Sequence, residues 1–373
     1  METPIIETIV GPSPETKFDN YAVGGGFNGF AQQPVHETIT IAALIASEMR
    51  LDPRTTYAIA VYEHQYDTLE FFRGVVWNDD PMNELFWDNK DDNFERGSGI
   101  SWAKYFEAGK LLSIDYTALG AIDRRNLIVR SHFGNLQFLH AMADKAGEAP
   151  QETQKKVLVW LEVMYKVAIG QISIDTKLRD VQIPGNNDQD RYPLRRLFDN
   201  DTQPCDTDTI HTLLTSNHKY KNVKHDRRAL GSCLHIIQDS YARGHCRRNR
   251  LPGFDSPERF GTIATYHTYS GQNSDDHEHY DYNRSITPIE KINCANIADF
   301  KGMVGATDAI HACTRLINYW MNKKPWEGAV QDWFTNQLFF VGADATHSNA
   351  LVDDFLSDIQ DKMGIERDVG AHV

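Results

Sequence analysis

The sequence predicts a mainly α-helical protein, and three observations lead to this prediction. Apolar residues recur at the three-to-four-residue spacing of amphipathic helices along much of the chain. Alternating runs of Val, Ile and Thr bounded by turn residues are nearly absent, which argues against extensive strands. Long polar stretches separate the helical patterns, and loops of such length inside a compact domain are usually functional. We therefore expect an all-α, multi-helix domain with long functional loops.

The individual helices are expected in order along the chain. Pro53 predicts the start of the second one, because proline favours the first helical turn. The expected helical ranges are 36–50, 53–67, 101–116, 123–146, 151–171, 207–218, 225–243, 299–322, 327–343 and 346–362. The expected long loops are 77–100, 181–204 and 248–295. We assign residues 1–33, which contain three consecutive glycines and no helical period, to an irregular N-terminal arm. Residues 34–365 are expected to form a single helical domain.

Composition and charge narrow the classes of function. The formal net charge of −14 disfavours polyphosphate partners such as nucleic acid. Five cysteines without a C-x-x-C pair argue against a disulfide framework and against a cysteine-rich zinc site. No apolar run approaches the roughly 18–20 residues of a membrane span, and the segment METPIIETIV lacks the features of a signal peptide. We expect a protein that stays in the cytoplasm or is exported by a specialised, signal-independent secretion system.

Histidines are concentrated in one stretch of the chain. Five of the 15 fall between His235 and His279, and neutral imidazole is the commonest metal ligand. His235 and Asp239 are four residues apart, so on a helix they lie on one face about 6 Å apart along the axis. His245 follows Gly244, a natural helix end, and would reach a second metal rather than that of His235. Asp239 would then lie between two metal sites.

A second pair repeats this spacing further along. His277 and Asp281 are also four residues apart, with His279 as an alternative ligand. Together with His245 they would supply two nitrogens and one carboxylate, which is a ligand set of catalytic zinc sites.

Upstream of this stretch, further candidates are more isolated. Asp79 and Asp80 precede Pro81, and His36 stands at the start of the first expected helix. His132 and His140 lie on the expected helix 123–146, about 80° apart, so we expect His140 to support His132 rather than to bind metal itself.

Each candidate also has a structural interpretation. A His/Asp pair at this spacing is often a surface ion pair, and a lone histidine such as His36 or His132 often satisfies a core hydrogen bond. Asp79 and Asp80 before a proline are typical turn residues. A cluster of arginines follows the helix and would bind substrate phosphate, or would only complement the helix C-terminus. Its members are Arg243, Arg247, Arg248 and Arg250.

The order and spacing of these residues resemble the superfamily of zinc-dependent phospholipases C and fungal single-strand nucleases. Both branches share the spacing of His235, Asp239 and His245. The phrases VHETITIAAL, GVVWNDDP, RSHFGNLQFLHAM and ALGSCLHIIQDSYARGH are most similar to a subgroup of bacterial phospholipases C related to HET-C. The resemblance extends over roughly residues 34–285.

The resemblance implies an all-helical fold, a cluster of two to three zinc ions, and a set of ligands. The first zinc would be bound by Asp79, His132, His235 and Asp239. The second would be bound by His245, His277 and Asp281. The third would be shared by His36 and Asp239. In secreted members an N-terminal tryptophan also binds the third zinc; here 35 residues precede His36, so that ligand has no counterpart.

The implied activity is that of a zinc-dependent phospholipase C. A metal-activated hydroxide would hydrolyse a phosphatidylcholine-like lipid to diacylglycerol and a phosphorylated head group, with Asp79 or Asp80 as the general base. Arg243, Arg247 and Arg248 would bind the substrate, and contact with the membrane surface would be transient. A nuclease or nucleotidase on the same metals, or a toxin-like protein without turnover, are the alternatives. We expect no obligatory protein partner, and we consider a role as a secreted virulence effector.

Overall fold

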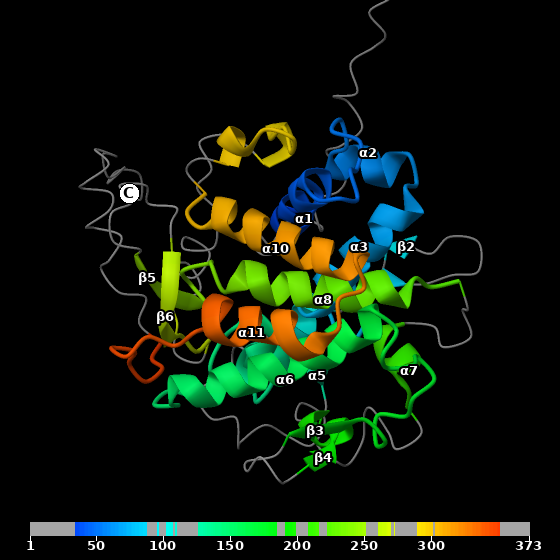
Figure 1. Cartoon of the computed structure of the whole chain (residues 1–373). Coiled ribbons are helices and arrows are strands. Elements are labelled where there is room, and N and C mark those ends of the chain that lie inside the picture. The colour runs from blue at the N-terminus through cyan, green and yellow to red at the C-terminus, as the bar shows by residue number, and fades with distance from the viewer. Residues whose placement is uncertain are drawn as a thin grey trace, which may run out of the picture.

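The computed structural model is dominated by helices, which confirms the predicted fold class at this level (Figure 1). The structure describes residues 34–87, 95–96, 102–106, 109, 126–184, 191–198, 208–215, 222–250, 260–269, 272, 289–300 and 303–350. The predicted arm, residues 1–33, lies outside these ranges. Residues 351–365 of the predicted helical domain also lie outside them.

The helices are shorter than the sequence pattern suggests. The α-helices are α1 (Val35–Ala46), α2 (Tyr57–Tyr62), α3 (Tyr66–Trp77), α5 (Leu127–Phe133), α6 (Pro150–Ala168), α7 (Ile210–Leu214), α8 (His225–Asp239), α10 (Ala306–Met321) and α11 (Gln331–Trp333). Two π-helical segments, Trp326–Val330 and Phe334–Leu338, flank α11. Shorter 3-10 helices cover Gln137–His140, Leu194–Phe198, Ile289–Lys291 and Ile297–Phe300.

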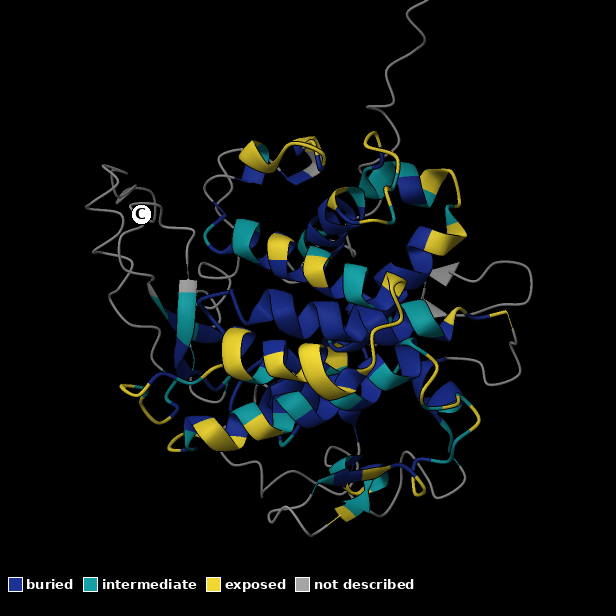
Figure 2. Ribbon diagram, in the orientation of Figure 1, coloured by how far each residue is buried: buried dark blue, intermediate teal, exposed yellow. Residues whose placement is uncertain are grey.

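Helix α8 is the centre of the fold. It runs between α10 on one side and α6 on the other (Figure 1), and it is buried along nearly its whole length (Figure 2). Its sequence, HDRRALGSCLHIIQD, places apolar or small residues on every face, as expected for a helix that is packed on all sides. Buried polar groups on this helix must therefore find partners inside the protein.

Two glycines allow α3 to pack closely on α8. A Cβ atom at Gly231 of α8 would lie 2.6 Å from the carbonyl oxygen of Phe71, and one at Gly74 of α3 would collide with the backbone of Arg228. Only glycine fits where two helix backbones approach so closely. This contact fixes where α3 ends, and Asp79 follows that end directly.

Strands are present where the sequence analysis expected only loops. The described residues form three two-stranded antiparallel sheets: β1 (Phe86–Trp87) with β2 (Glu95–Arg96), β3 (Gln182–Pro184) with β4 (Arg191–Pro193), and β5 (Cys246–Arg250) with β6 (Phe260–Tyr266). Strand β5 reads CRRNR and has no apolar alternation, so periodicity alone could not reveal it.

A segment near the C-terminus extends the β5–β6 sheet. Its residues 341–349 run parallel to β6, with bridges from Ile263 to Val341 and from His267 to Asn349. The amide of Gly342 donates to Ile263, and that of Thr268 donates to Asn349. We call residues 341–349 the C-terminal strap.

Three further expectations about helices were wrong in detail. Pro53 lies in a turn, and the next helix begins only at Tyr57, where Thr56 caps it by accepting the amide of Ile59. The expected helix 346–362 is not helical in its described part, residues 346–350, because this part belongs to the strap. The expected helix 123–146 is interrupted, which matters for the site.

Candidate metal centre

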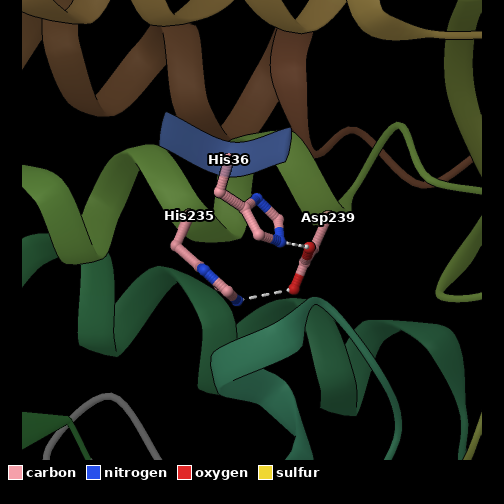
Figure 3. Close-up of side chains that lie close together, drawn as sticks. All are labelled: His36, His235 and Asp239. Carbon is pink, nitrogen blue, oxygen red and sulfur yellow. Dashed lines mark ion pairs between the residues drawn. The ribbon is translucent and has the colours of Figure 1, made fainter. Parts of the chain in front are cut away.

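The deepest part of the site comes from the second half of α8. His235 and Asp239 face the same side, as their spacing predicts, and Nε2 of His235 lies 2.8 Å from Oδ2 of Asp239 (Figure 3). Both side chains are almost completely buried, at 2% exposure or less. The predicted pair is thus an interior pair and not a surface ion pair.

His36 reaches this pair from the first turn of α1. Its Nε2 lies 3.4 Å from the other carboxylate oxygen, Oδ1 of Asp239 (Figure 3). The His36 and His235 rings are 4.3 Å apart between centroids. His36 retains 23% of its exposure, so it lies at the outer edge of the cluster.

Asp79 lies just after the C-terminal end of α3, which determines its position. The neighbouring Asn78 is fully buried and donates to the carbonyl of Leu139, while its Oδ1 accepts a hydrogen bond from Ser232. These bonds fix the chain at this point. Asp79 then lies 3.9 Å from Nδ1 of His235, with 31% of its side chain exposed.

His132 and His140 do not share a helix, contrary to the sequence analysis. Helix α5 ends at Phe133, Gly134 breaks the pattern, and the chain turns into the 3-10 helix that ends at His140. Nε2 of His132 consequently lies 3.7 Å from Asp79, while its Nδ1 lies 2.8 Å from the carbonyl of Ile128.

His140 is the functional residue whose role sequence reasoning missed. Its Nδ1 lies 3.1 Å from Oδ2 of Asp239, 3.0 Å from Nε2 of His235 and 3.8 Å from Oδ1 of Asp79. It therefore lies among the potential ligands and not behind them. The glycine at 134, in the middle of an assumed helix, was the signal that could have revealed the break.

His245 also lies closer than a continued helix would place it. Helix α8 ends at Asp239, and the turn that follows returns His245 to the site, where its Nδ1 is 3.4 Å from Oδ2 of Asp239. The same nitrogen donates to the carbonyl of His140 at 2.9 Å. A cation would therefore have to be bound through Nε2.

The pKa directions of Asp239, Asp79 and His140 suit a cation, whereas that of His235 is opposite: burial lowers its pKa, but the carboxylates of Asp239 and Asp79 outweigh burial and raise it above the usual value. Burial opposes ionisation of Asp239 and Asp79, but the surrounding histidines outweigh it and hold the pKa of each carboxyl below its usual range. Burial lowers the pKa of His140 to about 3, so this ring stays neutral. Ionised carboxylates and neutral imidazoles are the forms that bind metal ions.

The geometry supports metal binding by overlapping sets of residues. In each set the ligand atoms lie within 4.8 Å of one another. The sets are His36 with His235 and Asp239, Asp79 with His140 and His235, and His140 with Asp239 and His245. Nδ1 of His235 and Nε2 of His140 are buried and have no hydrogen-bond partner among the described residues. Because a neutral imidazole has one lone pair, each of these rings can bind a cation through this nitrogen or through the one that faces Asp239, but not through both.

Asp80 is placed differently from Asp79. It is fully buried, and its two carboxylate oxygens accept the backbone amides of Glu84 and Leu85 at 2.7 and 2.9 Å. Arg73 lies 3.9 Å away. The structure thus uses Asp80 to shape the turn after α3 and does not bring it into any of the ligand sets.

The predicted substrate-binding arginines also have contacts within the chain. The guanidinium of Arg248 donates to the carbonyls of Ser240, Gly261 and Leu338 and is buried. Arg247 donates to Thr265 at 3.4 Å, and Arg243 is buried. Arg248 therefore anchors the turn after α8 to β6 and to the segment after α11.

The remaining predicted ligands, His277 and Asp281, lie outside the described residues, as does the alternative His279. Among the residues that the structure does describe, no helix has both the length and the apolar character needed to cross a membrane. No family profile, curated protein or solved structure matches this chain.

Proposed function

We propose that this chain is a zinc-dependent phosphodiesterase. One observation carries the proposal: the buried carboxylate of Asp239 lies within 3.4 Å of ring nitrogens from four histidines. These histidines come from four separate segments of the chain, and they are His36, His140, His235 and His245. Convergence of this kind is typical of a metal centre and not of a surface ion pair.

Zinc fits the donor atoms and their spacing. Imidazole nitrogens with one or two carboxylates are a usual set for zinc at catalytic sites. Oδ2 of Asp239, Nδ1 of His140 and Nε2 of His235 form a triangle with sides of 2.8, 3.0 and 3.1 Å. Tetrahedral ligands at zinc bond lengths are about 3.3 Å apart, so these atoms need to separate by only a few tenths of an ångström.

Phospholipid is the substrate that we propose. The ligand order resembles the zinc-dependent phospholipases C, and the net charge of −14 disfavours nucleic acid. Hydrolysis would add water across the bond between phosphorus and the glycerol oxygen. The products would be diacylglycerol and a phosphorylated head group.

The exposure of the residues suggests how the site would work. A bound zinc ion supplies Lewis-acid stabilisation of phosphoryl oxygens and makes nearby water more acidic. His235, His140 and Asp239 are too deeply buried to meet a lipid, and they hold the centre in place. Asp79 is half-buried, so it is the carboxylate of the cluster that could orient a water beside the metal, while its lowered pKa makes it a weak base for the proton of that water.

A nuclease or nucleotidase with the same metal centre is the alternative enzyme. A toxin-like protein without turnover is the alternative without chemistry. Substrate choice separates the first two, because a nuclease needs an aromatic surface on which a base can stack.

Elemental analysis combined with activity assays tests the proposal. We expect two to three zinc ions per chain, and release of phosphocholine from phosphatidylcholine vesicles. His235→Ala should lower the zinc content and abolish this release. The matched control is His311→Ala, which removes an exposed histidine of α10 and should change neither quantity.

The outcomes separate the alternatives. Cleavage of single-stranded DNA, without release of phosphocholine, would indicate the nuclease. Full zinc content without either activity would indicate a binding protein. Fewer than two zinc ions per chain, unchanged by His235→Ala, would contradict the metal centre itself.

A further inference from the structure

Both ring nitrogens of His36 face consecutive residues of α8. Nδ1 lies 2.7 Å from Oε1 of Gln238, and Nε2 lies 3.4 Å from Oδ1 of Asp239. Gln238 is completely buried. It precedes the candidate ligand Asp239 in the chain, and its side-chain oxygen contacts the candidate ligand His36.

The amide of Gln238 is oriented by neighbours on two other helices. Its Nε2 donates to Oγ1 of Thr40, on α1, at 2.9 Å. The same nitrogen lies 3.9 Å from the sulfur of Cys313, on α10, whose thiol donates to the carbonyl of Leu234. Because this sulfur already donates elsewhere, it faces Gln238 as an acceptor. The NH₂ end of the amide therefore points to Thr40 and Cys313, and Oε1 is left for His36.

We propose that Gln238 is a positioning residue that keeps the proton of His36 on Nδ1, so that the lone pair on Nε2 points to a cation beside Asp239. This inference rests on the proposed metal centre and adds to it a residue that selects one form of a ligand. An imidazole that binds a metal ion is neutral and carries a single proton. Either nitrogen can hold that proton unless a hydrogen bond decides between them.

Two buried histidines of the cluster, His132 and His245, make a similar contact with a backbone acceptor. Nδ1 of His132 faces the carbonyl of Ile128 at 2.8 Å, and Nδ1 of His245 faces the carbonyl of His140 at 2.9 Å. These acceptors belong to the backbone and cannot be changed by substitution. At His36 the acceptor is a side chain, so this contact can be tested directly.

The first measurement concerns the proton itself. Long-range ¹H–¹⁵N correlation spectra of metal-free protein with labelled histidine report which ring nitrogen carries hydrogen, and His36→Ala assigns the signals. We expect Nδ1–H in the wild type and in Gln238→Glu, which keeps an acceptor. We expect Gln238→Met, which has similar length but no oxygen, to shift the population toward Nε2–H.

The second measurement is zinc affinity by competition with a coloured chelator. Groups that orient metal-bound histidines typically change metal affinity by about 10–100-fold. Gln238→Met should therefore lower the affinity for one zinc ion by about this factor. The Gln238→Glu variant should bind that ion as tightly as the wild type or more tightly. Thr40→Val removes one of the groups that orient the amide, and should have a smaller effect in the same direction.

Several outcomes would overturn the inference. If the spectra of the metal-free wild type place the proton of His36 on Nε2, the inference is wrong, and this result does not depend on whether any variant folds. Equal zinc affinity of Gln238→Met and Gln238→Glu, with both folded by circular dichroism, would reduce Gln238 to a packing role. If the wild type binds no zinc, the proposed function fails, while the spectra still decide the position of the proton.

Discussion

The two halves of α8 both bury charged groups, but they balance them differently. In the first half, Arg228 donates from Nε to Oε2 of Glu70 at 2.5 Å and from Nη2 to Oε1 at 3.3 Å, and it also donates to the carbonyl of Leu214. This is a two-pronged pair of opposite charges. In the second half, Asp239 faces four histidines, and two ring nitrogens of the cluster have no described partner.

The contrast shows that burial alone does not identify a functional site. Glu70 and Arg228 are each about 1% exposed, as are the deepest members of the histidine cluster. The pair is neutral and complete within the chain, so it contributes to the fold. The cluster gathers four imidazoles around one carboxylate and leaves two ring nitrogens without a described partner, which suits the metal centre proposed above.

Asp239→Asn should have the largest effect, because it removes charge from the shared carboxylate and hardly changes its shape. We expect zinc affinity to fall by more than about 100-fold, since even groups that only orient ligands contribute about 10–100-fold. Equilibrium dialysis followed by elemental analysis measures this. Unchanged zinc affinity would contradict the proposal that the second half of α8 binds metal through Asp239.

Arg228→Met should affect stability and not metal binding. Removing one partner of a buried ion pair typically costs about 3–5 kcal/mol, because the other charge is left unpaired. Urea unfolding measures this loss, and zinc per folded chain should stay constant. Replacing both partners, as in the double substitution Glu70→Leu with Arg228→Met, should recover part of the stability. A drop in zinc content of the folded variant would contradict the separation of the two halves.

A third, partly exposed cluster contains more acidic than basic groups. Lys156 lies 2.7 Å from both Asp144 and Glu148, so two carboxylates share one cation. Burial raises the pKa of Asp144 to about 6, above the value of about 3.9 in an unfolded chain. Between these values the folded state binds more protons, so the free energy of unfolding should fall as pH rises from about 4 to about 6.

Asp144→Asn should reduce this pH dependence. The shift of about 2 pH units corresponds to at most about 3 kcal/mol. Urea unfolding at a series of pH values measures it, with the wild type as the reference. A slope that survives the substitution would assign the pH dependence to another group.

Gly231→Ala should have the smallest effect on stability. It should affect both properties that the two halves of α8 otherwise separate, namely stability and zinc affinity. The added methyl would press on α3 at Phe71, and overpacking of this kind costs about 1–3 kcal/mol. Because α3 delivers Asp79, we also expect weaker zinc binding than in the wild type. Loss of stability without any change in zinc affinity would show that the shift of α3 does not reach its C-terminal end, next to Asp79.

The parts of the site that lie within one helix were predictable. The spacing of His235 and Asp239 fixes a common face, and the structure places both there. The parts that depend on chain reversals were not predictable. The break at Gly134 turns His140 into the site, and the end of α8 returns His245 to Asp239. Periodicity describes a helix but not the direction of the chain after it ends.

The roles of the charged residues could also not be predicted from the sequence. Asp79 and Asp80 are neighbours of the same type, yet one faces the cluster and the other accepts two backbone amides. We predicted that Arg248 binds substrate because it follows the helix that carries His235 and Asp239. The structure instead buries it among backbone carbonyls. Only tertiary packing decides which of two adjacent side chains points inward.

The C-terminal strap has a consequence for the order of events during synthesis. Strand β6 hydrogen-bonds to the strap on one side, and just beyond it His267 donates its amide to the carbonyl of His245 and accepts the amide of Ala143. The ribosome makes residues 341–349 long after His36, Asp79 and His235. A nascent chain would thus carry most ligands before the sheet that braces His245 is complete. We expect the centre to mature only after residues 341–349 have been synthesised.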